Sequence, residues 1–245
     1  MRETIMIIQP GAFGDIIICA PIAEAYWKAG YRIIWPVRKK FMEMLDSLLY
    51  VDSILLDEED LDDDWLRSDV IKCLRLLDQN PDWKVINLAD RGPHPTAQLP
   101  TENFEQVKYR LANIPFKQKH VFNWERNLVK ENYIYNRFVS NVIDGRPEKY
   151  AFVHNGSSHG DVVDIPKTTL PIVLIEDLSP KFSIYDWYQV IVLAAEIYVT
   201  ESAIWAFCDA LSNEITKERY LLPRSVMPDS GSWTISLNWK RDFYR

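Results

Sequence analysis

The stretch TIMIIQPGAFGDIII, residues 4–18, decides the fold class of this chain. Its first half is β-branched and apolar, which predicts a buried strand over Thr4–Gln9 that a proline–glycine pair ends. A mostly apolar helical pattern follows over Ile16–Ala29 and stops at Gly30. The glycine-containing turn between them therefore lies at the carboxyl end of a strand, the edge at which α/β sheets bind ligands.

The same alternation of strand and helix continues along the chain and predicts parallel α/β sheets. Before an aperiodic segment at 113–123, strands are expected at Tyr31–Val37, Val51–Leu56 and Trp83–Leu88, and helices at Lys39–Leu49, Asp60–Leu77 and Thr101–Ala112. After it, strands are expected at Tyr150–His154, Leu170–Ile175, Ile197–Thr200 and Arg219–Leu222, and helices at Glu125–Ile143, Ile184–Ala195 and Ser202–Leu211. We predict two α/β halves, residues 1–122 and 123–245.

The composition excludes several classes of protein. With 47% hydrophobic and 26% charged residues in 245, the balance is that of an ordinary globular protein. A net charge of −7 disfavours a nucleic-acid partner, because counterion release needs a basic surface. No apolar stretch approaches the ~20 residues of a transmembrane helix. The three scattered cysteines argue against a disulfide framework and a zinc cluster, and favour a reducing, cytoplasmic setting.

Glycine is scarce, and its positions are therefore informative. The chain has eight glycines, about half of the ~7% typical of proteins. Four of the eight fall in two short loops that follow apolar runs, Gly11 with Gly14 and Gly156 with Gly160. Glycine lets the backbone approach a ligand closely, so both loops are candidate binding sites.

The first loop fails two familiar phosphate-binding patterns. A dinucleotide fingerprint needs three glycines and an acid at the end of the second strand, but that strand ends in Trp35-Pro36. A P-loop needs Gly-Lys-Ser/Thr, whereas Gly14 is followed by Asp15. From spacing alone, Asp15 is either a helix N-terminal partner or a functional carboxylate.

The segment GAFGDIIICAP, residues 11–21, resembles the opening of the lipopolysaccharide heptosyltransferase family, glycosyltransferase family nine. In that family a strand runs into Gly-x-x-Gly-Asp, an apolar stretch, a small residue and proline. The resemblance implies a GT-B-like fold of two Rossmann-like α/β/α halves facing a cleft, with the acceptor side at 1–122 and the nucleotide-sugar side at 123–245. It also implies that Asp15 is the catalytic base, a role that suits its modest basicity when the leaving group is good. The acceptor-side loop is Gly11, Ala12, Phe13 and Gly14.

The second glycine loop is the first part of the expected donor site. Backbone amides and two hydroxyls cradle a phosphate well in a loop of this kind, formed here by Asn155, Gly156, Ser157 and Ser158. The family has a donor-contacting lysine after this loop. Lys167 is the nearest candidate here, and a solvated surface lysine is the alternative reading. His154 and His159 are poorly spaced for a metal site.

A later strand-to-helix turn completes the expected donor site. Free amides at a helix N-terminus bind a diphosphate, because the dipole and the N–H groups point the same way. The family has Asp-Ser/Thr-Gly and a later histidine at this place, which correspond here to Glu201, Ser202, Ala203 and Ala206. A plain helix cap at Glu201-Ser202 is the alternative. Glu176 is expected to accept hydrogen bonds from the donor ribose.

No metal and no cofactor are expected. The acidic run Asp62–Asp64 is typical of a solvated first helical turn rather than of an Asp-x-Asp metal site. In the family's architecture a helix dipole and basic residues stabilise the leaving diphosphate instead. No helix fits between Lys167 and Leu170, so the donor half is expected to be shortened.

These observations predict an inverting, metal-independent glycosyltransferase. It would move a sugar from a nucleotide-sugar donor, which is a substrate rather than a cofactor, to a hydroxyl of a glycan or glycolipid acceptor. Nucleic acid is not an expected partner, whereas peripheral contact with a membrane is left open. One alternative is a non-catalytic nucleotide- or sugar-binding module of the same fold. The other is a different nucleotide-dependent α/β enzyme such as an oxidoreductase, against which the missing GxGxxG counts.

Overall fold

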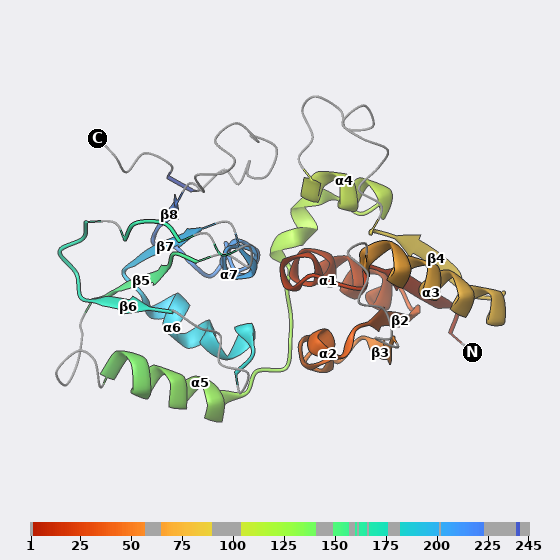
Figure 1. The fold of residues 1–245 in the computed structure, drawn as a ribbon, viewed down its shortest axis with the longest axis horizontal. Helices are drawn as coiled ribbons and strands as arrows, with labels where there is room; N and C mark the ends of the chain where they lie inside the picture. Colours follow the sequence, from red (N-terminus) through yellow and green to blue (C-terminus); the bar gives the residue numbers. More distant parts are fainter. Residues whose placement is uncertain are drawn as a thin grey trace. The chain divides into compact units, whose positions relative to one another are not determined.

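The computed structural model describes residues 2–56, 65–89, 104–140, 149–156, 160, 162–165, 167–175, 182–200, 202–222 and 239–240 (Figure 1). The chain divides into two compact units, Met1–Glu125 and Arg126–Arg245, here called unit 1 and unit 2. The sequence pattern placed the boundary after residue 122. Each unit contains a four-stranded sheet whose strand pairs are all parallel, so the predicted α/β class is confirmed.

Unit 1 alternates strands and helices from its first residues. Its elements are β1 (Thr4–Ile8), α1 (Phe13–Lys28), β2 (Arg32–Val37), α2 (Lys39–Asp46), β3 (Asp52–Leu55), α3 (Trp65–Gln79), β4 (Lys84–Asn87), α4 (Phe104–Leu111) and the 3-10 helix η2 (Phe116–His120). The strand order is β3-β2-β1-β4. The chain therefore changes direction across the sheet between β1 and β4, which makes their carboxyl ends the switch point of this sheet.

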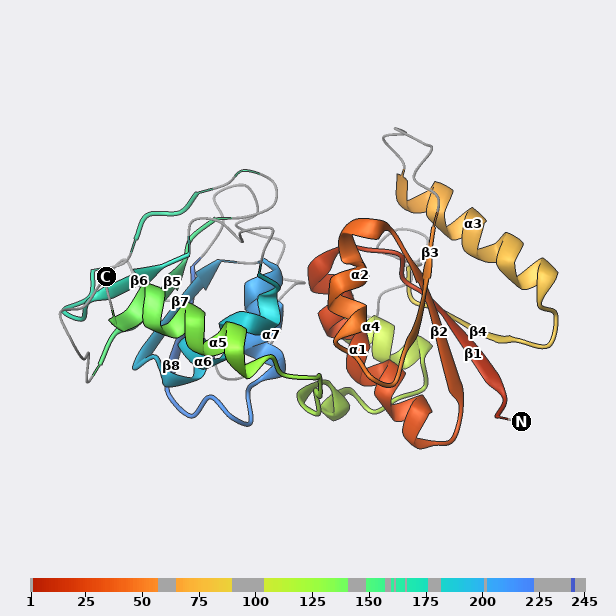
Figure 2. The same cartoon turned by 90° about the horizontal axis from the view of Figure 1, so that it is seen from below.

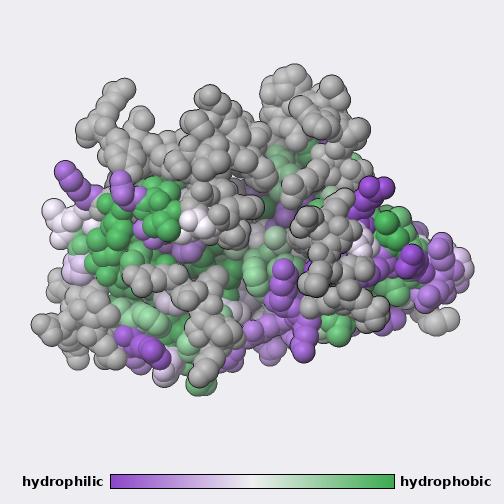
Figure 3. All heavy atoms as spheres, in the orientation of Figure 1, coloured by the Kyte–Doolittle hydropathy of each residue, from purple (hydrophilic) through white to green (hydrophobic). Residues whose placement is uncertain are grey.

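Helices cover both faces of the unit 1 sheet. Figure 2 shows α1, α2 and α4 on one side and α3 on the other. Met6 and Ile8 of β1 form a buried cluster with Cys73 of α3. Because side chains alternate along a strand, Ile5 and Ile7 point to the opposite face. Hydrophilic side chains dominate the described surface at the α3 end of unit 1 (Figure 3).

Two details of unit 1 differ from the sequence expectation. Helix α1 begins at Phe13 rather than at Ile16, so the glycine loop runs directly into the helix. The segment 113–123, expected to lack regular structure, contains η2. Pro115 is its N-cap, with φ at −58°, close to the angle at which proline is locked and which suits the start of a helix.

Unit 2 repeats the alternation. Its elements are α5 (Leu128–Tyr135), the π-helical turn η3 (Asn136–Ser140), β5 (Ala151–His154), β6 (Ile172–Leu174), the 3-10 helix η4 (Ile184–Trp187), α6 (Tyr188–Leu193), β7 (Glu196–Thr200), α7 (Ala203–Ala210) and β8 (Glu218–Leu222). The strand order is β6-β5-β7-β8. The switch point of this sheet lies between the carboxyl ends of β5 and β7.

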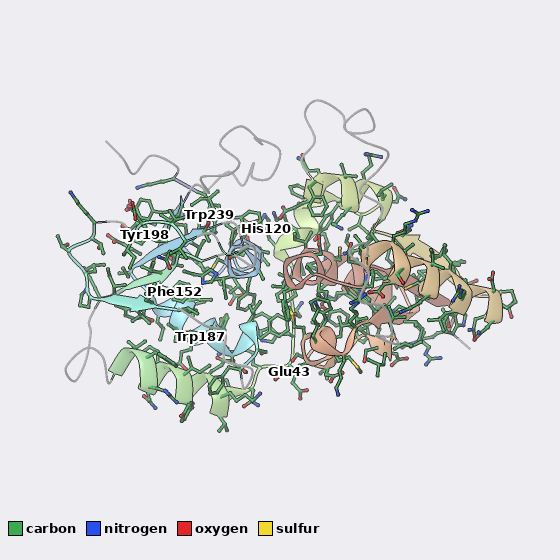
Figure 4. All side chains as sticks on the ribbon, in the orientation of Figure 1. Glu43, His120, Phe152, Trp187, Tyr198 and Trp239 are labelled. Atoms are coloured by element: carbon green, nitrogen blue, oxygen red, sulfur yellow. The ribbon has the colours of Figure 1, made fainter. Side chains whose placement is uncertain are left out.

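The two faces of the unit 2 sheet are covered differently. On one face, the hydroxyl of Tyr150 donates to the Val190 carbonyl of α6 at 2.6 Å. On the other face, Tyr198 stacks on Tyr220 with ring centroids 4.6 Å apart. Figure 4 labels Tyr198 on β7 and Phe152 on the neighbouring strand β5. Val163 and Leu170, between β5 and β6, pack on this second face, and none of the described residues between β5 and β6 is helical.

Candidate active site

The first glycine loop leads directly into the N-terminus of α1. Asp15 lies in the first turn of that helix, and its Oδ2 accepts the Ala12 N–H at 3.4 Å. The positive end of the helix dipole stabilises a carboxylate at this position. The Asp15 side chain is 16% exposed. An acid at the carboxyl edge of the sheet is thus ordered and partly open to solvent.

A buried lysine contacts that acid. Lys108, on α4, has a side chain only 3% exposed, and its Nζ lies 3.4 Å from Asp15 Oδ1. The same ammonium donates to Gln9 Oε1 and to the Leu88 carbonyl, each at 2.6 Å. Nζ also lies 4.4 Å from the centre of the Phe104 ring. One cation therefore joins the end of β1, the end of β4 and the start of α1.

Sequence reasoning did not single out Lys108. The signal was present, because Lys108 follows Phe104 by four positions and precedes Ala112 by four, which places it on the apolar side of the predicted helix. A lysine at a buried helical position needs polar partners. Those partners come from β1, β4 and α1, and the tertiary structure alone brings them together.

Other side chains hold the backbone at the carboxyl edge of the unit 1 sheet. The Trp35 indole donates to the Gln9 carbonyl at 2.8 Å, and the Gln9 amide donates to the Gly11 carbonyl. Phe13 is 38% exposed and meets Phe41 edge-on, with centroids 4.8 Å apart. Hydrogen bonds therefore hold the backbone before and within this loop, and the loop carries one exposed aromatic ring, that of Phe13.

Arg38 supplies a second cation at this edge, directly after β2. Its Nε lies 2.5 Å from Oδ2 of Asp69, a fully buried residue of α3. Lys72 lies 3.9 Å from the other oxygen of the same carboxylate. The pair joins α3 to the end of β2.

In unit 2, the loop after β5 closes on itself. The Asn155 side-chain amide donates to the Val163 carbonyl at 2.8 Å, and the Asn155 carbonyl accepts the Val163 N–H at 2.9 Å. Gly156 pairs with Val162 in an antiparallel bridge, and a Cβ added at Gly156 would meet no atom within 4 Å. Asn155 thus shapes the loop. Lys167 is exposed.

At the N-terminus of α7, Ser202 caps the helix, as in the alternative reading of this turn. The Ser202 hydroxyl accepts the Trp205 N–H at 3.3 Å, and the helix begins at Ala203. Nearby, the Thr200 hydroxyl at the end of β7 and the Trp205 indole N–H are buried and lack a hydrogen-bond partner among the described residues. Unpaired buried polar groups need an explanation such as a bound water or ligand. The sequence analysis missed both groups.

Several expected donor residues lie outside the described part of the chain. They are Ser157, Ser158, Glu176 and Glu201, and His159 lies outside it as well. The acidic run Asp62–Asp64 also lies outside it. Across the described residues, no group of three or more His, Cys, Asp and Glu side chains is arranged to hold a metal. None of the helices described is long and apolar enough to cross a membrane.

His154 ends β5 at the same edge of unit 2. Burial lowers the pKa of its imidazole below the ordinary value, although the nearby Ile175 carbonyl opposes this effect. The Nδ1 atom lies 3.4 Å from that carbonyl oxygen. The imidazole is therefore mainly neutral at pH 7 and forms a half-buried part of the strand end.

Solved structures of glycosyltransferases have a similar fold. One is ADP-heptose lipopolysaccharide heptosyltransferase II of E. coli, with a TM-score of 0.58 and 11% identity, covering 98% of this chain and 90% of that chain. This chain has the heptosyltransferase fold. A glycosyl transferase of family 9 from Veillonella parvula DSM 2008 has a TM-score of 0.55 and 11% identity, covering 89% of this chain and 80% of that chain.

The family resemblance of GAFGDIIICAP is confirmed at the level of the fold, and so is the GT-B-like architecture. No family model matches the chain, and no curated protein matches its sequence. In this chain, Asp15 and Lys108 lie at the switch point of unit 1, and the β7–α7 turn lies at the switch point of unit 2.

Proposed function

We propose that this protein is an inverting, metal-independent glycosyltransferase, with Asp15 as the general base. It transfers a sugar from a nucleotide-sugar donor to a hydroxyl of a glycan or glycolipid acceptor. The observation that carries the proposal is the Asp15 carboxylate, held at the first turn of α1 by Lys108 and the Ala12 N–H in a protein with the heptosyltransferase fold.

The chemistry needs one base on the acceptor side. The acceptor oxygen attacks the anomeric carbon from the face opposite the nucleotide, so the new carbon–oxygen bond forms as the bond to the diphosphate oxygen breaks. The acceptor proton passes to the Asp15 carboxylate, and the configuration at the anomeric carbon inverts. A single positioned carboxylate suffices, because the diphosphate leaves readily without being protonated.

The donor binds in unit 2. The N-terminus of α7 offers free backbone N–H groups and a positive dipole end to the leaving diphosphate, a role that a metal plays in other transferases. The buried Thr200 hydroxyl next to this turn, which has no hydrogen-bond partner in the part of the chain that the structure describes, supports a ligand there. The other proposed donor contacts are Asn155, Gly156, Ser157, Ser158, Lys167, Glu176, Glu201, Ser202 and Ala203. Because the E. coli neighbour is an ADP-heptose heptosyltransferase, ADP-heptose is the first donor to test.

A second candidate function is nucleotide-sugar binding without transfer. It is favoured by two alanines at the positions where the resembling family carries a glycine and a histidine. Ala203 begins α7, and Ala206 is buried within it at 3% exposure. Neither methyl group can hydrogen-bond a leaving phosphate.

Transfer and hydrolysis assays with ADP-heptose and other nucleotide sugars test the proposal. Asp15→Asn should lower kcat by about 10²- to 10⁴-fold, because a positioned base contributes that much, while donor affinity by calorimetry stays unchanged. Asp78→Asn, at an exposed position of α3, is the matched control. Full activity in Asp15→Asn would remove Asp15 from the mechanism. Saturable nucleotide binding without turnover in the wild type would favour the non-catalytic module.

The same assays test the mechanism. The product's anomeric configuration, read by NMR, should be opposite to that of the donor, and turnover should persist in EDTA. Retention of configuration or loss of turnover in EDTA would contradict that part of the proposal.

A further inference from the structure

Lys108 occupies an unusual place in unit 1. Ligands of doubly wound sheets bind at the switch point, where the strand order reverses. In unit 1 that point lies between β1 and β4. The Lys108 ammonium bonds there to Gln9, just after β1, and to Leu88, just after β4. A buried cation thus bridges the two strand ends at which a ligand would otherwise be expected.

The burial of the Lys108 charge costs free energy and therefore needs an explanation. A buried lysine is costly unless it is paired and hydrogen-bonded, and apolar residues often replace buried ion pairs without loss of stability. Lys119, also buried, pairs with the buried carboxylate of Glu105 on α4. Among the described residues, Lys108 instead contacts only one carboxylate, that of Asp15, which is partly exposed.

The contacts of Asp15 show what the lysine does. An acid in the first turn of a helix tends to fold back onto the backbone N–H at the N-cap, as in a capping box. Here that contact, from the Ala12 N–H to Oδ2, is present at 3.4 Å, and Oδ1 lies at the same distance, 3.4 Å, from the Lys108 ammonium. The helix cap and the ammonium therefore each hold one oxygen of the carboxylate.

We propose that Lys108 is the positioning residue of the Asp15 base. Its ammonium, anchored on the Gln9 side chain and the Leu88 carbonyl, holds Asp15 Oδ1. Oδ2, which accepts only the Ala12 N–H among the described residues, is then the oxygen that takes the acceptor proton. Without Lys108 only the Ala12 contact holds the carboxylate, which is then free to rotate out of the attack geometry. This inference rests on the proposed function of Asp15.

The test compares substitutions of the two buried lysines in the full-length protein. Lys108→Met should lower kcat by about 100-fold at unchanged KM for the donor, since a displacement of about 1 Å costs that much. Lys108→Arg keeps the charge but presents a planar fork, so its kcat should lie between those of wild type and Lys108→Met. Lys119→Met, which also removes a buried cation next to α4, should keep the wild-type kcat per folded molecule.

Two results would overturn the inference. One is a wild-type kcat in Lys108→Met. The other is an equal loss of kcat in Lys119→Met, which would show a general effect of lost buried charge. If Lys108→Met does not fold, Lys108→Arg decides: a reduced kcat at unchanged KM supports the positioning role, and a wild-type kcat refutes it.

A measurement without turnover separates this inference from the proposed function. In urea unfolding, the Lys108→Met and Asp15→Asn effects should be non-additive by about tenfold in the unfolding equilibrium constant, as expected for residues in contact. If no donor is turned over yet the coupling is found, the proposed function fails and the Lys108–Asp15 pair stands. If Asp15→Asn abolishes transfer and the two effects add, the positioning role fails alone.

Discussion

His154 shows how burial at a strand end sets the charge of a single residue. Its imidazole is half-buried beside the Ile175 carbonyl, and desolvation outweighs the opposing effect of that carbonyl on its pKa. The folded protein therefore takes up a proton at His154 less readily than the unfolded chain does. Folding stability is linked to this difference in proton affinity.

We expect stability to fall as the pH drops below the ordinary histidine pKa of about 6.5. In that range the unfolded chain binds the proton first, so protonation favours unfolding. Urea unfolding at about pH 7.5 and about pH 5.5 measures the loss. The loss should be smaller in His154→Gln, because glutamine does not titrate. An equal loss in both proteins would show that His154 does not contribute.

The residue scale also shows what local sequence can and cannot identify. Asp15 was predicted as a site residue because the segment around it, whose glycines and helix start are its neighbours in sequence, resembles the opening of the heptosyltransferase family. Lys108 was missed because its partners Gln9, Leu88 and Asp15 are far from it along the chain. Thr200 was missed because a lack of hydrogen-bond partners has no sequence signal.

At the scale of elements, helix α1 ends as the sequence predicted. Gly30 has φ of +99°, its N–H bonds to the Trp27 carbonyl at 2.9 Å, and the Tyr31 N–H bonds to the Tyr26 carbonyl at 3.2 Å. This is the Schellman arrangement, in which a left-handed residue closes the last turn. This C-terminal stop turns the chain from α1 into β2.

Gly30→Ala should destabilise the protein by about 1 kcal/mol or more, because a Cβ disfavours left-handed backbone. No atom lies within 4 Å of the added Cβ, so the cost is conformational rather than a clash. Gly156→Ala is the matched control, since that site is equally open and its φ is not positive. Urea unfolding measures both variants, and equal stabilities would contradict the backbone explanation.

The elements differ in how well their bounds followed from the sequence. Strands were located closely, because short β-branched runs bounded by proline, glycine or charged residues are local signals. The predicted helix Ile184–Ala195 is instead the 3-10 turn η4 followed by α6. Apolar periodicity does not separate tight from regular helical turns, and Trp187 packs where the two meet.

At the scale of the whole molecule, each unit has its own parallel sheet and buried core. The two carry different groups at their switch points. In unit 1 Lys108 occupies that position. In unit 2 the N-terminus of α7 is capped by Ser202, and two buried polar groups beside it lack a hydrogen-bond partner among the described residues. Nucleotide binding is therefore assigned, in the proposed function, to unit 2 alone.

We expect ADP to slow hydrogen exchange at the amides of Ala203 and Ile204 and to leave the β1–α1 loop unprotected. At 100 times its dissociation constant, a ligand should add about 2.7 kcal/mol of stability, which a thermal shift detects. Asp15→Asn should show the same shift, because it lies in unit 1. Protection of the β1–α1 loop in place of α7 would contradict the assignment.

The sequence by itself determined the two α/β halves, the parallel sheets and the glycine loop that precedes Asp15. Those features follow from periodicity and turn residues, which act over a few neighbouring positions. Only the tertiary structure decided that Lys108 meets Asp15, that the Thr200 hydroxyl has no hydrogen-bond partner among the described residues, and that Val163 and Leu170 pack on one face of the second sheet. These depend on strand order and burial, because hydrogen bonds and ion pairs form between groups that are close in space, whatever their separation along the chain.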